Sequence, residues 1–170
     1  ESPQQDDDIK NSNSLIDLNN AFTNKIFKIS IKKNYSFKKP LIIYHTTNEK
    51  IKSKNINLKL EFQLEQNSSL RLIDYFNYSS EKNFINIFYN FDLKKDAILK
   101  NFKVDKKQNQ NVKYSYNNIN QDKNSISETF VLSCGSSFLK NEINCNLNGK
   151  YSSAFVNGIF SLVNNQQHEI

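Results

Sequence analysis

Apolar and polar residues alternate in short segments along this chain, and this alternation restricts the folds that the chain can adopt. In residues 57–65 every second residue from Leu58 to Leu64 is apolar, so these side chains fall on one face of an extended strand. The period of two dominates over the helical period of 3.6. Similar segments are residues 26–31, 41–44, 70–76, 84–91, 98–104, 126–132, 138–147 and 154–163.

Short polar turns separate these predicted strands, at residues 64–72, 91–99, 132–139 and 147–155. Repetition of strand, tight turn and strand with no helical segment between them predicts a stacked β-solenoid. An antiparallel sandwich or barrel fits the same short strands. The many asparagines favour the solenoid, because its corners need left-handed backbone angles and the chain has only three glycines.

Length and composition predict one domain and exclude several classes of protein. A chain of 170 residues without Met is expected to be a processed chain or a fragment. Residues 1–14 are polar and acidic, which predicts a disordered tail before a folded core over residues 15–170. No apolar run is long enough to span a membrane, and the acidic start does not resemble a signal peptide, so no membrane contact is expected.

The charge and the cysteines further restrict partners and location. The net charge of +6 comes from scattered lysines, with Arg71 the single arginine, whereas nucleic-acid surfaces usually cluster arginine and lysine. We therefore expect no nucleic acid among the partners. Two cysteines do not make the disulfide framework of a small secreted domain, so a reducing compartment, the cytoplasm, is expected.

Several segments, in order, resemble the SufD family of the SUF iron–sulfur cluster assembly machinery. Residues 14–22 (S-L-I-D-L-N-N-A-F) and 39–45 (K-P-L-I-I-Y-H) resemble the family's entry into its β-helix. Residues 141–149 (N-E-I-N-C-N-L-N-G) are similar to a family turn, and residues 157–168 to its N-G and Q-H elements. Lys140 departs from the family, which commonly has arginine there.

This resemblance implies an all-β fold, a right-handed parallel β-helix, from which the family's terminal helical regions are absent. It also implies a non-catalytic scaffold subunit that pairs with a SufB-like subunit and works with a SufC-like ATPase, bound through a region outside this chain. It implies no tightly bound cofactor and allows a transient iron–sulfur cluster in the complex.

Cys145 is the main candidate for a sulfur or iron contact, because residues 145–149 have the spacing of a C-x-L-x-G element that the resemblance relates to SufB. A thiolate is a soft ligand for iron and an acceptor of persulfide sulfur. The alternative is a small buried apolar residue. Cys134 lies in a predicted turn without a supporting motif and is expected to be structural.

The two histidines are weaker candidates. His168 is a candidate metal ligand because it matches the Q-H element of the resemblance, while His45 follows an apolar strand and is expected to be a hydrogen-bonded or exposed residue. The two cysteines and the two histidines do not have the spacing of a four-ligand zinc or cluster site.

Two functions of other classes remain as alternatives. A β-solenoid can be a carbohydrate-active enzyme or binding module, but such enzymes need clustered carboxylates. A lysine-rich surface for an acidic partner is the other alternative, and the scattering of the lysines disfavours it. The carboxylates of this chain are expected at turns and strand ends without paired spacing: Asp74, Asp92, Asp96, Asp105 and Asp122.

Overall fold

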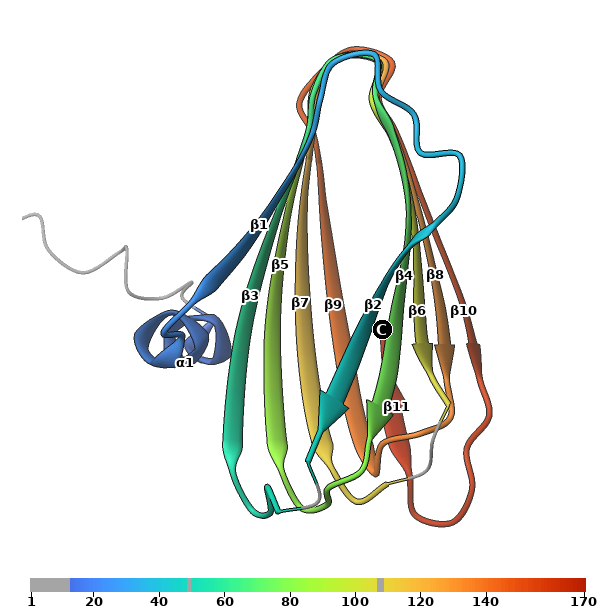
Figure 1. Ribbon diagram of the computed structural model, residues 1–170. Coiled ribbons are helices and arrows are strands. Elements are labelled where there is room, and N and C mark those ends of the chain that lie inside the picture. Colours follow the sequence, from blue (N-terminus) through green and yellow to red (C-terminus); the bar gives the residue numbers. More distant parts are fainter. Residues whose placement is uncertain (1–12, 49, 107–108) are drawn as a thin grey trace, which may run out of the picture.

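The computed structural model of the chain describes residues 13–48, 50–106 and 109–170. In these residues the strands form two facing sheets, sheet A in the order β1-β3-β5-β7-β9-β11 and sheet B in the order β10-β8-β6-β4-β2 (Figure 1). The elements are α1 (Ser14–Phe22), β1 (Ile26–Ile31), β2 (Leu41–Thr47), β3 (Asn55–Leu64), β4 (Ser69–Tyr78), β5 (Phe84–Leu93), β6 (Ile98–Asp105), β7 (Val112–Gln121), β8 (Ile126–Ser133), β9 (Phe138–Leu147), β10 (Ser153–Phe160) and β11 (Gln167–Glu169).

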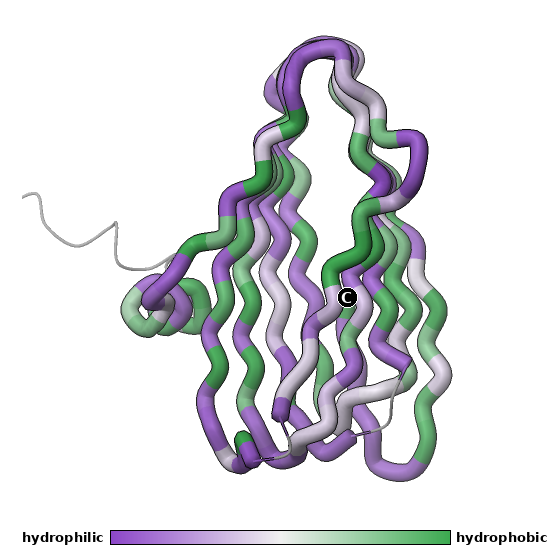
Figure 2. The backbone as a smooth tube through the Cα atoms, in the orientation of Figure 1, coloured by the Kyte–Doolittle hydropathy of each residue, from purple (hydrophilic) through white to green (hydrophobic). Residues whose placement is uncertain are grey.

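Consecutive strands alternate between the two sheets, and each strand pairs in parallel with the strand two places further along the chain. In Figure 1 the strands of sheet A run up and those of sheet B run down while later coils recede, which is a right-handed path. The chain is therefore a right-handed parallel β-helix, as the resemblance implied, and the antiparallel sandwich or barrel that the strand pattern had left open is excluded. Along most strands the hydropathy alternates from residue to residue (Figure 2).

Tight turns at the narrow end of the coils use asparagine in the left-handed region, as predicted. Asn34, Asn67 and Asn124 have φ of 61°, 54° and 59°, Asp96 has the same conformation in the coil between them, and no glycine has a positive φ. The turns stack, because the backbone N–H of Asn67 donates to Lys95 in the next coil and the N–H of Asp96 donates to Lys123. The left-handed residues of successive coils are therefore in register.

The helix α1 was not predicted, because residues 14–22 were interpreted as part of the entry into the β-helix. Asn13 caps this helix, its side chain accepting from the N–H of Leu15 at 3.1 Å. Asn19 is fully buried, and its Nδ2 donates to the carbonyls of Leu58 and Asn86 at 3.1 and 2.9 Å. The helix thus crosses the outer face of sheet A. The predicted tail lies outside the described residues except for Asn13 and Ser14, and Ser14 already belongs to this helix.

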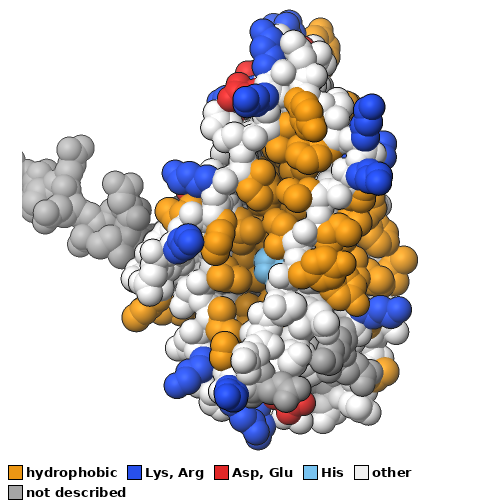
Figure 3. Space-filling view, in the orientation of Figure 1, with side chains coloured by type: hydrophobic (Ala, Val, Ile, Leu, Met, Phe, Trp, Pro, Cys, Tyr) orange, Lys and Arg blue, Asp and Glu red, His pale blue; other side chains and the backbone are white. Residues whose placement is uncertain are grey.

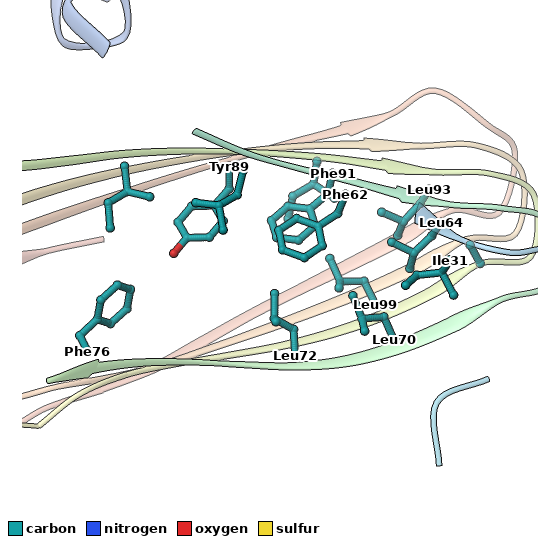
Figure 4. Packing of buried hydrophobic residues seen from close by; sticks show 14 of the residues in the cluster. Ile31, Phe62, Leu64, Leu70, Leu72, Phe76, Tyr89, Phe91, Leu93 and Leu99 are labelled. Carbon is teal, nitrogen blue, oxygen red and sulfur yellow. The ribbon is translucent and has the colours of Figure 1, made fainter. Parts of the chain in front are cut away.

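Inward-facing side chains of the first coils form the apolar core. Phe62 and Phe91, register partners on β3 and β5, stack with ring centroids 4.7 Å apart (Figure 4). Leu70 and Leu72 on β4 face them from sheet B. Each such buried side chain stabilises the fold by about 1.5–3 kcal/mol. The fully buried members of this core are Leu64, Leu72, Ile85, Ile87, Tyr89, Phe91, Leu93, Ala97, Leu99 and, from a later coil, Ile119.

Candidate functional site

The interior of the solenoid contains a cluster of buried charges that strands from β4 to β7 contribute. On β4 the inward positions read Leu70, Leu72, Asp74 and Phe76, so the alternation places Asp74 inside the solenoid, where it is fully buried. Lys103, its register partner on β6, also faces inward and is 2% exposed. The expectation that Asp74 lies at a turn or strand end was wrong, because the residue occupies an inward position in the middle of β4.

Asp74 connects three side chains from three strands. Its Oδ1 lies 3.0 Å from His45 Nε2, and its Oδ2 lies 3.6 Å from Lys103 Nζ, an ion pair too long for a hydrogen bond. The hydroxyl of Tyr89 lies 3.3 Å from His45 Nε2, and Lys103 Nζ lies 3.4 Å from the centre of the Tyr89 ring. The ring face thus gives the lysine a second favourable contact in the interior.

A second buried pair joins Lys113 of β7 to Asp105 at the end of β6. Lys113 Nζ lies 2.8 Å from Asp105 Oδ2, and both side chains are almost fully buried. The hydroxyl of Ser136 donates to the same oxygen at 2.8 Å. The Lys113 ammonium also lies 3.5 Å from the centre of the Phe76 ring. This pair therefore has the short hydrogen-bonded geometry that the pair of Asp74 and Lys103 lacks.

Burial and charge pairing shift the pKa values in this cluster. Burial lowers the pKa of Lys103 to about 8, against the opposing attraction of Asp74. Burial also lowers the pKa of Lys113, with Asp105 opposing. For Asp74, burial alone raises the pKa, but the charge of Lys103 and the hydrogen bond from His45 outweigh it and leave the pKa lowered. The interior thus holds fixed ions of both signs, and Lys103 is the cation closest to losing its proton at neutral pH.

Further polar side chains surround these charges, and several have no partner. Among the described residues, both amide atoms of Asn101, the hydroxyl of Thr129 and the Oδ1 of Asn117 are buried without a hydrogen bond. Others are satisfied: Gln121 Nε2 donates to the carbonyl of Ser153 at 2.8 Å. Each unsatisfied buried polar group costs about 1–3 kcal/mol. The later coils therefore contribute less to stability than the apolar coils do. Stability alone does not explain why this region has buried polar residues.

Cys145 faces the same interior from β9. It is the register partner of Ile119 and packs against the apolar core. The side chain is half-buried, and burial raises the pKa of its thiol, with a hydrogen bond to Ser127 opposing in part. The neutral thiol therefore predominates at pH 7, although the thiolate is the nucleophile and metal ligand. Both cysteines are free, and the Cys134 thiol lies 3.8 Å from the carbonyl of Lys106 on the outside of the coil.

The structure does not bring His168 to Cys145. His168 pairs with Leu139 on β9, six residues before Cys145, a distance of about 20 Å along a strand. Its Nε2 lies 2.7 Å from the carbonyl of Ser136, and its Nδ1 lies 2.9 Å from the hydroxyl of Ser133. A metal at His168 must displace one of these contacts. In the described part of the chain, no three His, Cys, Asp or Glu side chains are grouped so that they could hold a metal ion.

Comparison with family models identifies the family to which most of this solenoid belongs. The model described as "SUF system FeS cluster assembly, SufBD core domain" matches residues 44–170. The chain belongs to the SufBD core family. Its membership connects the solenoid to iron–sulfur cluster assembly by the SUF system, together with other Suf subunits. Comparisons with curated proteins and with solved structures gave no match.

The family match covers the strands that carry the buried charges but does not say which SufBD branch the chain represents. Sequence reasoning missed the roles of Lys103, Asp105 and Lys113. The alternation of β6 could have predicted that Lys103 faces inward. Asn101, Lys103 and Asp105 alternate there with outward residues. No helix of the described residues has the length and apolar character needed to cross a membrane.

Proposed function

We propose that this chain is a SufD-type scaffold subunit of the SUF machinery, non-catalytic, cytoplasmic and without a tightly bound cofactor of its own. In this proposal it pairs with a SufB-like subunit and works with a SufC-like ATPase, and a transient iron–sulfur cluster forms in the complex. The observation that carries the proposal is the match of the SufBD core domain to residues 44–170 of a parallel β-helix. The order of the segments at residues 141–149 and 157–168 supports the SufD type.

Cys145 has a place in this proposal as a contact for sulfur or iron. It lies on β9 as the register partner of Ile119, and its side chain is half-buried. In this proposal a partner subunit brings the sulfur or iron to the thiol. Since burial raises the pKa of the thiol, the partner must also supply the group that removes its proton.

Co-expression of the chain with candidate SufB and SufC partners tests the proposal. Size-exclusion chromatography is expected to give a three-component complex, and the SufC ATPase rate is expected to rise in it. Cys145→Ser is expected to lower the yield of assembled cluster while leaving the complex intact, and Cys134→Ser, on the outside of the coil, serves as the matched control. A chain that stays alone and leaves the ATPase unchanged would refute the scaffold function.

A further inference from the structure

The outer face of sheet B carries a band of apolar side chains that no described element covers. Two neighbouring outward rows cross the strands at right angles and keep apolar residues from β2 to β8. The exposed members include Tyr44, Phe102 and Ile159, at 64%, 40% and 55%. We name this band the sheet B band, and its residues are Ile42, Tyr44, Ile73, Tyr75, Phe102, Val104, Phe130, Leu132 and Ile159.

The shape of the sheet B band selects the kind of occupant. Five strands about 4.8 Å apart make it about 20 Å long, and two rows of side chains make it about 13 Å wide. Its flat area is thus about 260 Å², well below the 800 Å² or so that each partner buries in a stable protein–protein interface. A second copy of the chain packed face to face is therefore disfavoured. A single α-helix, about 10–12 Å in diameter, matches the width of the band.

The chain itself shows how a helix lies on such a sheet. The helix α1 crosses the outer face of sheet A, with Asn13 hydrogen-bonded to Tyr114 of β7 and Asn19 to the backbone of β3 and β5. It therefore runs across the strands, as the sheet B band does. A helix of about 13–16 residues, at 1.5 Å per residue, would cover the band from β2 to β10.

Charged residues beside the sheet B band indicate which charge a docked helix should carry. The outward row that precedes it carries Arg71 on β4, Lys100 on β6 and Glu128 on β8. Lys100 pairs with Glu128 at 3.0 Å, while Arg71 is exposed and pairs with no carboxylate of the described residues. Lys106 follows β6 at the other border and is exposed. Figure 3, which looks onto the first coil, shows hydrophobic side chains in the middle of that face and Lys and Arg side chains around its edges.

We infer that the sheet B band docks an amphipathic helix of a partner protein, with an apolar face on the band and acidic residues toward Arg71 and Lys106. Apolar burial supplies the affinity, because the two rows present a continuous apolar surface of helix width. The acidic flank supplies orientation and specificity through complementary charge. This docking surface lies on the outer face of sheet B and needs no SufB-like subunit, so it can hold or fail independently of that pairing.

Two synthetic helical peptides of 14 residues with the same leucine face, one with glutamate and one with lysine at the polar positions, test the inference. Fluorescence anisotropy with the full chain is expected to show the glutamate peptide binding about tenfold more tightly at low salt, with the difference shrinking as salt rises. Equal binding of both peptides, or no binding of either, would overturn the inference.

Substitutions locate the site. Phe102→Asn is expected to weaken binding of the glutamate peptide by about tenfold. The control is Phe88→Asn, which removes an aromatic side chain from the outer face of sheet A and is expected to change the affinity less than twofold. Arg71→Glu changes an exposed charge and is expected to reverse the preference toward the lysine peptide. If sedimentation instead shows a dimer that Phe102→Asn separates, a second copy occupies the band and the inference is wrong.

Discussion

The interior of this solenoid changes character between its earlier and later coils, although the backbone does not. Between β3, β4 and β5 most inward side chains are leucine, isoleucine, phenylalanine or tyrosine, with Phe62 on Phe91 at the centre and Asp74 as the charged exception. Between β6, β7 and β8 most inward positions are polar (asparagine, glutamine, serine, threonine, lysine and aspartate), and the apolar exceptions are Leu99, Ile119 and Val131. The parallel register continues through both regions without interruption.

This contrast separates two sources of stability. In the early coils apolar burial stabilises the structure by about 1.5–3 kcal/mol per side chain. In the later coils the buried pairs of Asp74 with Lys103 and of Asp105 with Lys113 contribute about as much as they cost in desolvation. The later coils are therefore supported by their backbone ladders, their stacked turns and the apolar coils beside them.

The largest effect is expected from Asp74→Ala. Removing this carboxylate leaves Lys103 buried without its counter-ion and His45 without its acceptor, and we expect the free energy of unfolding to fall by about 5 kcal/mol. Urea denaturation measures it. Asp92→Ala is the control, because the pair of Asp92 with Lys94 at 2.8 Å is partly exposed, and its loss is expected to cost below about 1 kcal/mol. Similar losses in the two variants would show that the interior is not a low-dielectric environment.

Phe91→Ala is expected to lower the free energy of unfolding by about 3–5 kcal/mol, because it opens a cavity opposite Phe62 in the apolar coils. Phe88→Ala removes the same ring from the outer face of the same strand, where the side chain is half-buried, and about 1 kcal/mol is expected. Urea denaturation of both variants compares them. A small effect of Phe91→Ala would refute the assignment of most of the stability to the early coils.

Much of the fold was predictable from the sequence, and the apolar coils explain why. Period-two alternation located the strands from β3 to β6 to within a few residues. The strand β7 was missed, because its inward positions include Lys113, Ser115, Asn117 and Gln121, which give no apolar alternation. The strand was therefore not detected because its interior residues are polar. A prediction of burial from hydropathy fails where the buried residues are polar.

The helix α1 and the charged cluster were not predicted for a related reason. The helix is only nine residues long, and a polar contact, the buried Asn19, holds it on the sheet. Asp74 and Lys103 are 29 residues apart and meet only through the register of the coils. The candidate Cys145 was placed on an inward position, and its contact with sulfur or iron stays a prediction.

The pH dependence of stability is expected to distinguish the two interiors further. Since burial lowers the pKa of Lys103 from 10.5 to about 8, the unfolded chain binds more protons than the folded chain between these values, and stability rises with pH from about 8. From about pH 9 the Cys145 thiol opposes this rise, and above pH 10 the buried hydroxyls of Tyr78 and Tyr89 do so too, because the pKa values of these groups are raised in the folded chain. The informative window is therefore pH 8–10.

Lys103→Met tests this assignment. The free energy of unfolding of the parent chain is expected to rise from pH 8 to 10 by an amount on the order of 2 kcal/mol, and the variant is expected to lose most of that rise. Lys113, whose pKa burial also lowers, supplies the remainder. Lys95→Met changes an exposed lysine at the turn and is the control. If the free energy of unfolding of Lys103→Met rises with pH as steeply as that of the parent chain, the proton lost in this pH window is not that of Lys103.

The smallest expected effect tests whether the turns are alike in both regions. Asn67 belongs to an apolar coil and Asn124 to a polar one, yet both adopt the left-handed conformation at the same corner and donate from Nδ2 to the preceding corner, to Asn34 at 3.0 Å and to Asp96 at 2.8 Å. Alanine at either position is expected to cost about 1–2 kcal/mol in urea denaturation, because it must adopt a conformation unfavourable for a residue with Cβ, and glycine is expected to cost less. Equal losses at the two positions would assign the difference between the regions to their interiors alone. A much larger loss at Asn124 would instead show that the polar coils depend on their turns for the stability that their interior does not provide.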